Sequence, residues 1–210
     1  MNDVVVDSQI GAAPVDNASE PELPPYEGIA LANVRLVSSN ADAAAALTAL
    51  MASDAIGFDT ESKPTFRKGE VSTGPHLIQL ATEEIVYLFQ SIGTAHVDVL
   101  KAILESPKVV KAGFGLRDDL KRLQVKFGIE TANVVDLAIA LRDDKYDDRR
   151  KDIGAKTAVA RFFGKKLQKS KRTSTTNWAN PNLNDRQILY AADDAQVALK
   201  VYRVWKGKIK

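Results

Sequence analysis

Cysteine is absent from this 210-residue sequence, which excludes disulfide bridges, thiolate metal sites and cysteine nucleophiles. No apolar run approaches the roughly 20 residues of a transmembrane helix. The N-terminus also lacks the basic start and apolar centre of a secretory signal. A phosphate-binding P-loop is missing, and "GFG" at 113–115 is not followed by the spacing of a dinucleotide fingerprint. We therefore expect a soluble, cytoplasmic protein with no membrane partner and no nucleotide cofactor.

Charge is unevenly distributed along the chain. The formal net charge is +2, but residues 1–34 contain six acids and no base, which leaves a charge of +8 on the remainder. Four of the eight prolines fall in the same stretch, which has no apolar periodicity. We therefore expect residues 1–30 to form a disordered acidic arm and residues 31–210 to form one domain. A basic domain can attract a polyanionic partner, although many basic proteins bind none.

From residue 33 onward, short β-rich runs alternate with helical periods. The sequence predicts strands at 34–39, 55–62, 75–82, 84–90 and 108–114, helices at 41–53, 96–106, 116–127, 152–163 and 184–206, and a further element within 134–143. Several strands followed by mostly helical sequence predict an α/β fold in which helices flank a mixed β-sheet.

Two carboxylates share one face of the strand predicted at 55–62. Side chains alternate along a strand, so Asp59 and Glu61 point to one face, whereas Phe58 and Thr60 point to the other. On a solvent-facing strand this pair would be only the polar side, which is the commoner explanation for an isolated D-x-E.

The helix predicted at 116–127 offers a choice between two aspartates. Its leucines form an apolar stripe, with Asp119 on the flank of that stripe and Asp118 on the far side. A carboxylate that borders the core needs a partner, and an ion pair with a neighbouring lysine or arginine is the structural explanation for Asp119.

The last predicted helix contains a second pair of aspartates. Asp194 lies in the middle of the apolar face, one turn after Tyr190, whereas Asp193 lies on the polar side with Gln196. The structural explanation for an inward Asp194 is a hydrogen bond from a buried backbone or hydroxyl group.

Four acids from three separate elements are thus predicted to face or border the core. They are Asp59, Glu61, Asp119 and Asp194. Converging carboxylates require a counter-charge, which lysines or arginines can supply. Oxygen-only clusters of this kind also suit Mg²⁺ or Mn²⁺, two of which can lie about 3.5–4 Å apart. Convergence would therefore indicate a site for two divalent metal ions.

The stretches "FDTES", "GFGLRDDL" and "YAADD" resemble, in this order, the three motifs of the DEDD superfamily of 3′-5′ exonucleases. Tyr190 stands four residues before Asp194, as in the tyrosine (DEDDy) branch, and the position of the alternative histidine, 189, is a leucine. Over residues 33–206 the sequence is similar to ribonuclease D and to the exonuclease domain of the Werner-syndrome helicase.

The resemblance implies a ribonuclease H-like fold and a metal-dependent exonuclease that releases nucleoside monophosphates from the 3′ end of DNA or RNA. It implies that Asp59, Glu61 and Asp194 hold one Mg²⁺ or Mn²⁺ ion and that Asp59 and Asp119 hold a second. Tyr190 would orient the attacking water. Two alternatives share these residues: a non-catalytic nucleic-acid-binding adaptor on the same fold, and an α/β domain whose inward acids pair with arginines.

Several residues are candidates for binding a single-stranded or frayed 3′ end. Residues 156–172 contain seven bases and no acid, among them Lys169 and Arg172, although solvated loops are often basic too. Phe66 and Trp178 could stack on a base, and Trp178 could equally anchor its loop to the core. Thr60, within the first motif, is a further candidate. The two histidines, His76 and His96, match no metal or triad spacing and are expected to be structural.

Overall fold

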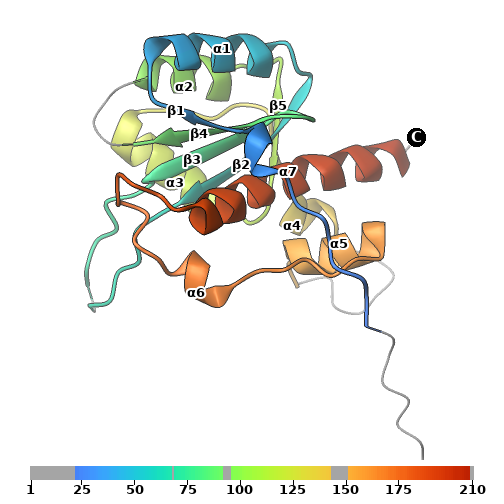
Figure 1. The fold of residues 1–210 in the computed structure, drawn as a ribbon. Helices are drawn as coiled ribbons and strands as arrows, with labels where there is room; N and C mark the ends of the chain where they lie inside the picture. The colour runs from blue at the N-terminus through green and yellow to red at the C-terminus, as the bar shows by residue number, and fades with distance from the viewer. Residues whose placement is uncertain (1–21, 68, 92–95, 143–150, 209–210) are drawn as a thin grey trace, which may run out of the picture.

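The computed structural model describes residues 22–67, 69–91, 96–142 and 151–208 (Figure 1). One sheet contains the strands β1 (Val34–Val37), β2 (Ala55–Glu61), β3 (Leu77–Ala81), β4 (Val86–Gln90), β5 (Val110–Gly113) and β6 (Val134–Asp136). The helices are η1 (Leu31–Asn33), α1 (Asn40–Met51), α2 (Val97–Leu104), α3 (Arg117–Phe127), α4 (Leu137–Ala140), α5 (Ala155–Phe163), α6 (Lys171–Ser174) and α7 (Asp185–Lys208).

The sheet is mixed, with the strand order β1-β4-β3-β2-β5-β6. β3 runs antiparallel to β2 and β4, whereas β1 is parallel to β4 and β5 is parallel to β2 and β6. The antiparallel strands follow one another in the chain, while each parallel pair is separated by at least one helix, as parallel pairing requires. The predicted α/β fold with a mixed sheet flanked by helices is confirmed.

Helices cover both faces of the sheet (Figure 1). On one face, Phe58 of β2 packs in a buried cluster with residues of α1, α2 and α3. α7 crosses the other face, and Gly57 permits its close approach, because a Cβ atom there would lie 1.9 Å from the carbonyl oxygen of Ala195. Among the helices of the described ranges, none combines the length and apolar character needed to span a bilayer.

The predicted strands and helices all have counterparts in the structure. Within 134–143, of which residue 143 lies outside the described residues, the predicted element is resolved into β6 and α4. Asp136 separates them, because its side chain accepts the N–H of Ala138 at 3.0 Å and caps α4. The single turns η1 and α6 were not predicted, because such short helices show no apolar period.

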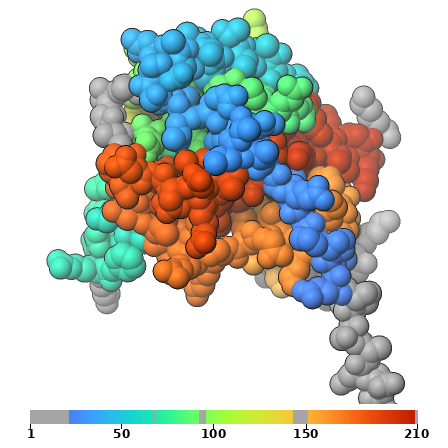
Figure 2. Space-filling model, viewed as in Figure 1, coloured from blue at the N-terminus to red at the C-terminus, as the bar shows by residue number. Residues whose placement is uncertain are grey.

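Residues 22–30, named here the N-terminal strap, pack against the domain. Tyr26 N donates to the carbonyl oxygen of Lys166 at 2.9 Å, and Ile29 N donates to Oδ1 of Asp193 at 2.8 Å. Figure 2 shows the strap, in blue, running alongside the orange part of the chain. Residues 1–21 of the expected arm lie outside the described residues. Over 22–30, however, the expectation of disorder is corrected, because Ile29 is buried and the backbone is hydrogen-bonded.

Candidate active site

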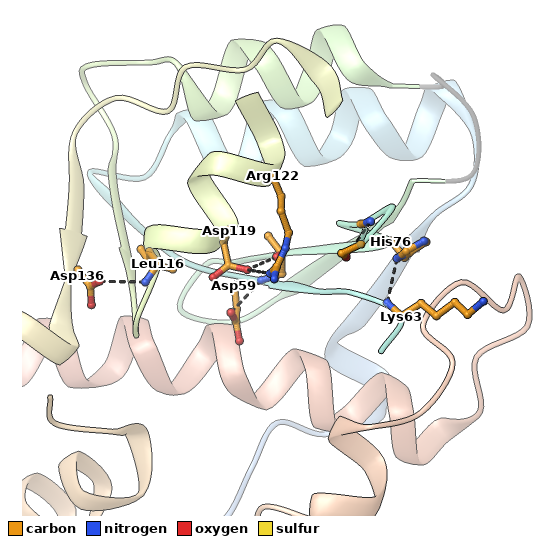
Figure 3. A network of polar contacts seen from close by, with 10 residues as sticks. Asp59, Lys63, His76, Leu116, Asp119, Arg122 and Asp136 are labelled. Atoms are coloured by element: carbon orange, nitrogen blue, oxygen red, sulfur yellow. Dashed lines mark hydrogen bonds and ion pairs between the residues drawn. The ribbon is translucent and has the colours of Figure 1, made fainter. Parts of the chain in front are cut away.

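β2 presents two of the four acids to the face that α7 covers. Asp59 and Glu61 follow Gly57 at alternate positions and therefore share its side of the sheet. Figure 3 shows Asp59 directed from the strand towards the terminal helix. Oδ1 of Asp59 accepts the N–H of Thr60 at 2.9 Å. The close contact at Gly57 thus brings β2 near enough to α7 for side chains of the two elements to meet.

α7 contributes Asp194 and Tyr190. Asp194 is only 7% exposed, which confirms its inward direction, and Tyr190 lies one turn before it on the same helix. The Tyr190 ring contacts the buried Trp178 ring at 6.0 Å between centroids, which fixes the position of the phenol.

Asp193 differs from the prediction of a solvated polar side. Its carboxylate accepts the N–H of Ile29, and a Cβ atom at Gly28 would lie 2.3 Å from Oδ1 of Asp193. Gln196, predicted on the same polar side, is 4% exposed. The helical projection was correct, but the N-terminal strap covers that side of α7, which a pattern within the helix does not report.

α3 contributes Asp119, which approaches β2 from the opposite face. The hydroxyl of Thr60 donates to Oδ1 of Asp119, and Nη1 of Arg122 lies 3.8 Å from the same oxygen (Figure 3). Asp118 is exposed, so the choice of Asp119 as the inward aspartate is confirmed. The ion pair considered as its structural explanation is also present.

Asp136 positions the helix that carries Asp119, and sequence reasoning missed it. Its two carboxylate oxygens accept the N–H groups of Gly115 at 2.8 Å and Leu116 at 3.0 Å, just before α3 begins (Figure 3). These are backbone donors that a helix start leaves without an intrahelical partner. The available signal was an aspartate that ends a β-rich run, but the sequence did not show that it reaches a different helix.

Burial and mutual repulsion disfavour the charged forms of these acids. Burial raises the pKa of Asp59 well above its usual value, and the charges of Asp194 and Asp119 raise it further. Burial, followed by the charges of Asp59 and Asp194, raises the pKa of Glu61 to about 9. The four acids are therefore within electrostatic reach of one another at one end of β2.

Besides Arg122, which pairs with Asp119, a second cation lies beside these acids. Nζ of Lys169 is 2.7 Å from Oδ1 of Asp194, and it lies 5.8 Å from the centroid of the Tyr190 ring. The sequence predicted Lys169 as a contact for nucleic acid, whereas the structure places it against the predicted metal ligand Asp194. The hydrogen-bonding partner of Asp194 is thus an ammonium and not the backbone or hydroxyl group considered as its structural explanation.

The chemistry of the four side chains fits hard divalent cations. All of their donors are carboxylate oxygens, and their repulsion requires positive charge nearby. Within the described ranges, however, no three acidic or histidine side chains are arranged as a ready-made metal site. Two of the acids are turned to other partners: Asp119 to Thr60 and Arg122, and Asp194 to Lys169.

The predicted contacts for nucleic acid divide into exposed and buried residues. Phe66 is 82% exposed, and exposed Arg172 lines a cavity of about 850 Å³ together with Ser170, Thr173, Thr176 and Arg186. Trp178 is 1% exposed and its indole N–H donates to the carbonyl oxygen of Ser174 at 3.2 Å. Of the two roles considered for Trp178, its burial supports anchoring of the loop to the core.

Two further side chains near the first motif have local structural partners. Thr60 is 8% exposed and its hydroxyl donates to Asp119, so this hydroxyl has a structural partner, and a contact of Thr60 with nucleic acid stays a prediction. Nδ1 of His76 accepts the N–H of Lys63 at 3.0 Å and so fixes the segment after β2 (Figure 3). His76 is structural, as expected.

Comparison with known proteins places this geometry in a family. A protein-family model described as a 3′-5′ exonuclease matches residues 34–209. The bifunctional 3′-5′ exonuclease/ATP-dependent helicase WRN of Mus musculus is 30% identical over 151 residues, which is 71% of this chain and 11% of that protein. The chain spans about half or less of the length of the curated relatives that it matches.

Two solved structures share the fold. The Nibbler EXO domain of Aedes aegypti has a TM-score of 0.72 and 26% identity, over 86% of this chain and 90% of that chain. RNase D of Escherichia coli, described as an exoribonuclease involved in structured RNA processing, has a TM-score of 0.69 and 27% identity, over 83% and 46% of the two chains. By its fold, its three ordered motifs and the match over residues 34–209, the chain belongs to the 3′-5′ exonuclease family of the DEDD superfamily.

Proposed function

We propose that this chain is a metal-dependent 3′-5′ exonuclease that hydrolyses phosphodiester bonds at the 3′ end of DNA or RNA and releases nucleoside monophosphates. The observation that carries the proposal is that β2, α3 and α7 approach one another where they carry these acids. Thr60 of β2 donates to Asp119 of α3, and the close contact at Gly57 packs α7, with Tyr190 and Asp194, against the strand. Acids that repel one another are not needed to stabilise the fold, so their clustering from separate elements indicates a functional site.

The residues that would hold the metal ions are the four acids. Asp59, Glu61 and Asp194 would hold one divalent cation, and Asp59 with Asp119 would hold the other. When bound, such ions lower the pKa of a water molecule and neutralise the charge that builds on the phosphate. For this arrangement Asp194 would have to leave Lys169, and Asp119 would have to turn from Thr60 and Arg122.

Tyr190 is suited to orient a water molecule as a neutral phenol. Burial and the charge of Asp194 raise the pKa of Tyr190 to about 12, so that its hydroxyl keeps its proton at neutral pH. We therefore assign it the donation or acceptance of a hydrogen bond at the attacking water, and not the role of the base that removes the proton.

The substrate would be bound by exposed groups on two segments, one around α6 and one after β2. Arg172, Arg186 and the hydroxyl of Ser170 line the cavity beside α6 and form a surface that suits phosphate oxygens. Phe66, exposed on the segment after β2, is suited to stack on a base of a single-stranded or frayed end.

A strand-shortening assay tests the proposal. With Mn²⁺ or Mg²⁺, the purified chain is expected to shorten a 5′-labelled single-stranded oligonucleotide stepwise and to release nucleoside monophosphates, and Asp194→Asn is expected to abolish both. Asp118→Asn serves as the matched control, because Asp118 lies exposed on α3 next to the inward Asp119. Binding of the oligonucleotide without shortening under either metal would overturn the enzymatic proposal in favour of a nucleic-acid-binding adaptor.

A further inference from the structure

The partner of Asp194 is a lysine from a distant part of the chain. Lys169 lies between α5 and α6, and its Nζ is 2.7 Å from Oδ1 of Asp194. The Asp194 side chain is 6% exposed and that of Lys169 is 27% exposed, so the pair is largely withdrawn from water. A pair at this depth is screened much less than a surface ion pair, and removing one partner leaves an uncompensated buried charge.

The segment that carries Lys169 is held in place by the N-terminal strap. Lys166 N donates to the carbonyl oxygen of Pro24 at 2.8 Å, and Tyr26 N donates to the carbonyl oxygen of Lys166 at 2.9 Å. Ile29 of the same strap binds Asp193, the residue next to Asp194. The strap thus connects the backbone near the ammonium with the helix that carries its carboxylate.

Lys169 interacts electrostatically with all three acids of the α7 face, Asp59, Glu61 and Asp194. Burial disfavours its ammonium, but the charges of Asp194 and Asp59 favour it and raise the pKa of Lys169 overall. The same ammonium lowers the pKa of Glu61 against the repulsion of the neighbouring acids. The Lys169 ammonium therefore favours the ionised forms of acids on both β2 and α7.

We propose that Lys169 is an internal counter-ion of the metal-free acid cluster, and that a divalent cation must displace its ammonium from Asp194 before it can bind there. Two positive charges cannot share this carboxylate at contact distance without strong repulsion in a poorly hydrated site. The lysine side chain is long and flexible, so its ammonium can leave without movement of the backbone. The next residue in the chain, Ser170, lines the cavity beside α6, where the released ammonium can meet a substrate phosphate.

This inference rests on the proposed function for the identity of the metal, but its test needs no substrate. Mn²⁺ binding is measured by calorimetry on the wild-type chain, Lys169→Met and Lys171→Met. Lys171 is the matched control, because it is an exposed lysine of the same segment. We expect Lys169→Met to bind Mn²⁺ about tenfold more tightly than wild type, because no ammonium competes for Asp194. Lys171→Met is expected to change the affinity much less.

Thermal unfolding separates a counter-ion from a purely structural lysine. In EDTA, Lys169→Met is expected to have a lower Tm than wild type, because Asp194 is left without its partner. In saturating Mn²⁺ the difference is expected to disappear or reverse. An unchanged or weaker Mn²⁺ affinity, with the same loss of Tm in both conditions, would overturn the inference.

A measurement on the wild-type chain covers the case in which Lys169→Met fails to fold. Acylation of amines, followed by mass spectrometry, reports how available each lysine is. Lys169 is expected to react faster with Mn²⁺ present than in EDTA, relative to Lys171 in the same sample. A ratio that does not change with Mn²⁺ would overturn the inference while leaving exonuclease activity untouched, whereas wild-type protein that binds no Mn²⁺ at all would contradict the metal site of the proposed function itself.

Discussion

The buried acids on the two faces of the sheet have different compensating partners. On the α3 face, Asp119 has a hydroxyl donor in Thr60 and a guanidinium in Arg122, both close in space and one of them on its own helix. On the α7 face, Asp59 and Glu61 disfavour the ionisation of one another and of Asp194, and the cation that contacts Asp194 is Lys169, from the segment between α5 and α6. Asp119 thus has its own compensating partners, whereas on the α7 side burial and neighbouring acids disfavour ionisation, and a divalent cation would supply the charge that the ionised carboxylates need.

Neutralising one acid on each face gives the largest expected effects. Asp59→Asn is expected to lower the rate of strand shortening by about a thousandfold or more, because this acid would contact both metal ions. In EDTA the same change is expected to raise Tm, since it removes a buried carboxyl group whose ionisation is disfavoured by burial and by the neighbouring acids. The measurements are single-turnover assays with Mn²⁺ and thermal unfolding without metal.

Asp119→Asn is the counterpart on the α3 face and sharpens the comparison. We expect it also to impair shortening, but to raise Tm in EDTA less than Asp59→Asn does. The new amide would keep an acceptor for Thr60 but would lose the attraction of Arg122, which offsets part of the benefit of removing the charge. Equal gains in Tm from the two substitutions would contradict the distinction between the faces.

Tyr190→Phe is expected to have the next largest effect on activity. Loss of one hydrogen bond to the attacking water should reduce kcat by about ten- to a hundredfold, with little change in KM. Because the pKa of Tyr190 is raised to about 12, the pH profile below pH 9 should keep its shape in the variant. Loss of a rising limb of the profile in Tyr190→Phe would show that the phenolate takes part.

Asp136→Ala tests the residue that supports the start of α3 and also caps α4. It removes the acceptor of the N–H groups of Gly115, Leu116 and Ala138, and we expect a loss of about 1–2 kcal/mol in the free energy of unfolding. Asp136→Asn keeps one good acceptor and should recover part of this loss. Urea unfolding of both variants measures the effect, and a loss equal in the two would indicate that the charge, and not the hydrogen bonds, stabilises this region.

The direction of each acid could be predicted from the sequence. Helical projection identified Asp119 over Asp118 and the inward Asp194, because those choices depend only on the period of one helix. Strand alternation placed Asp59 and Glu61 on one face for the same reason. Local periodicity therefore predicted the direction of each acid.

Contacts between distant segments could not be read in this way. The ion pair of Lys169 with Asp194, and the strap bond from Ile29 to Asp193, join residues whose proximity depends on the complete fold. Asp136 was missed because its partners Gly115 and Leu116 precede a different helix. The residue type of Trp178 did not settle its role, since an indole can stack on a nucleic-acid base or pack in the protein core. Its burial supports packing in the core.

The smallest expected effect is a pH dependence of stability that belongs to the α7 face. The folded-state pKa of Glu61, about 9, lies above its unfolded value of 4.5, so the folded chain binds a proton that the unfolded chain has released. Its contribution to stability is therefore fully present below pH 4.5 and is lost as pH rises towards 9.

In EDTA, the Tm of the wild-type chain should fall between about pH 6 and pH 8.5 by more than that of Glu61→Gln. With Mn²⁺ bound, the carboxylate would be held ionised, so the difference between wild type and Glu61→Gln should lose its dependence on pH. Parallel Tm curves in EDTA would mean that Glu61 is already ionised without metal, and the excess negative charge of the α7 face would then have to be relieved by water or by Lys169 alone.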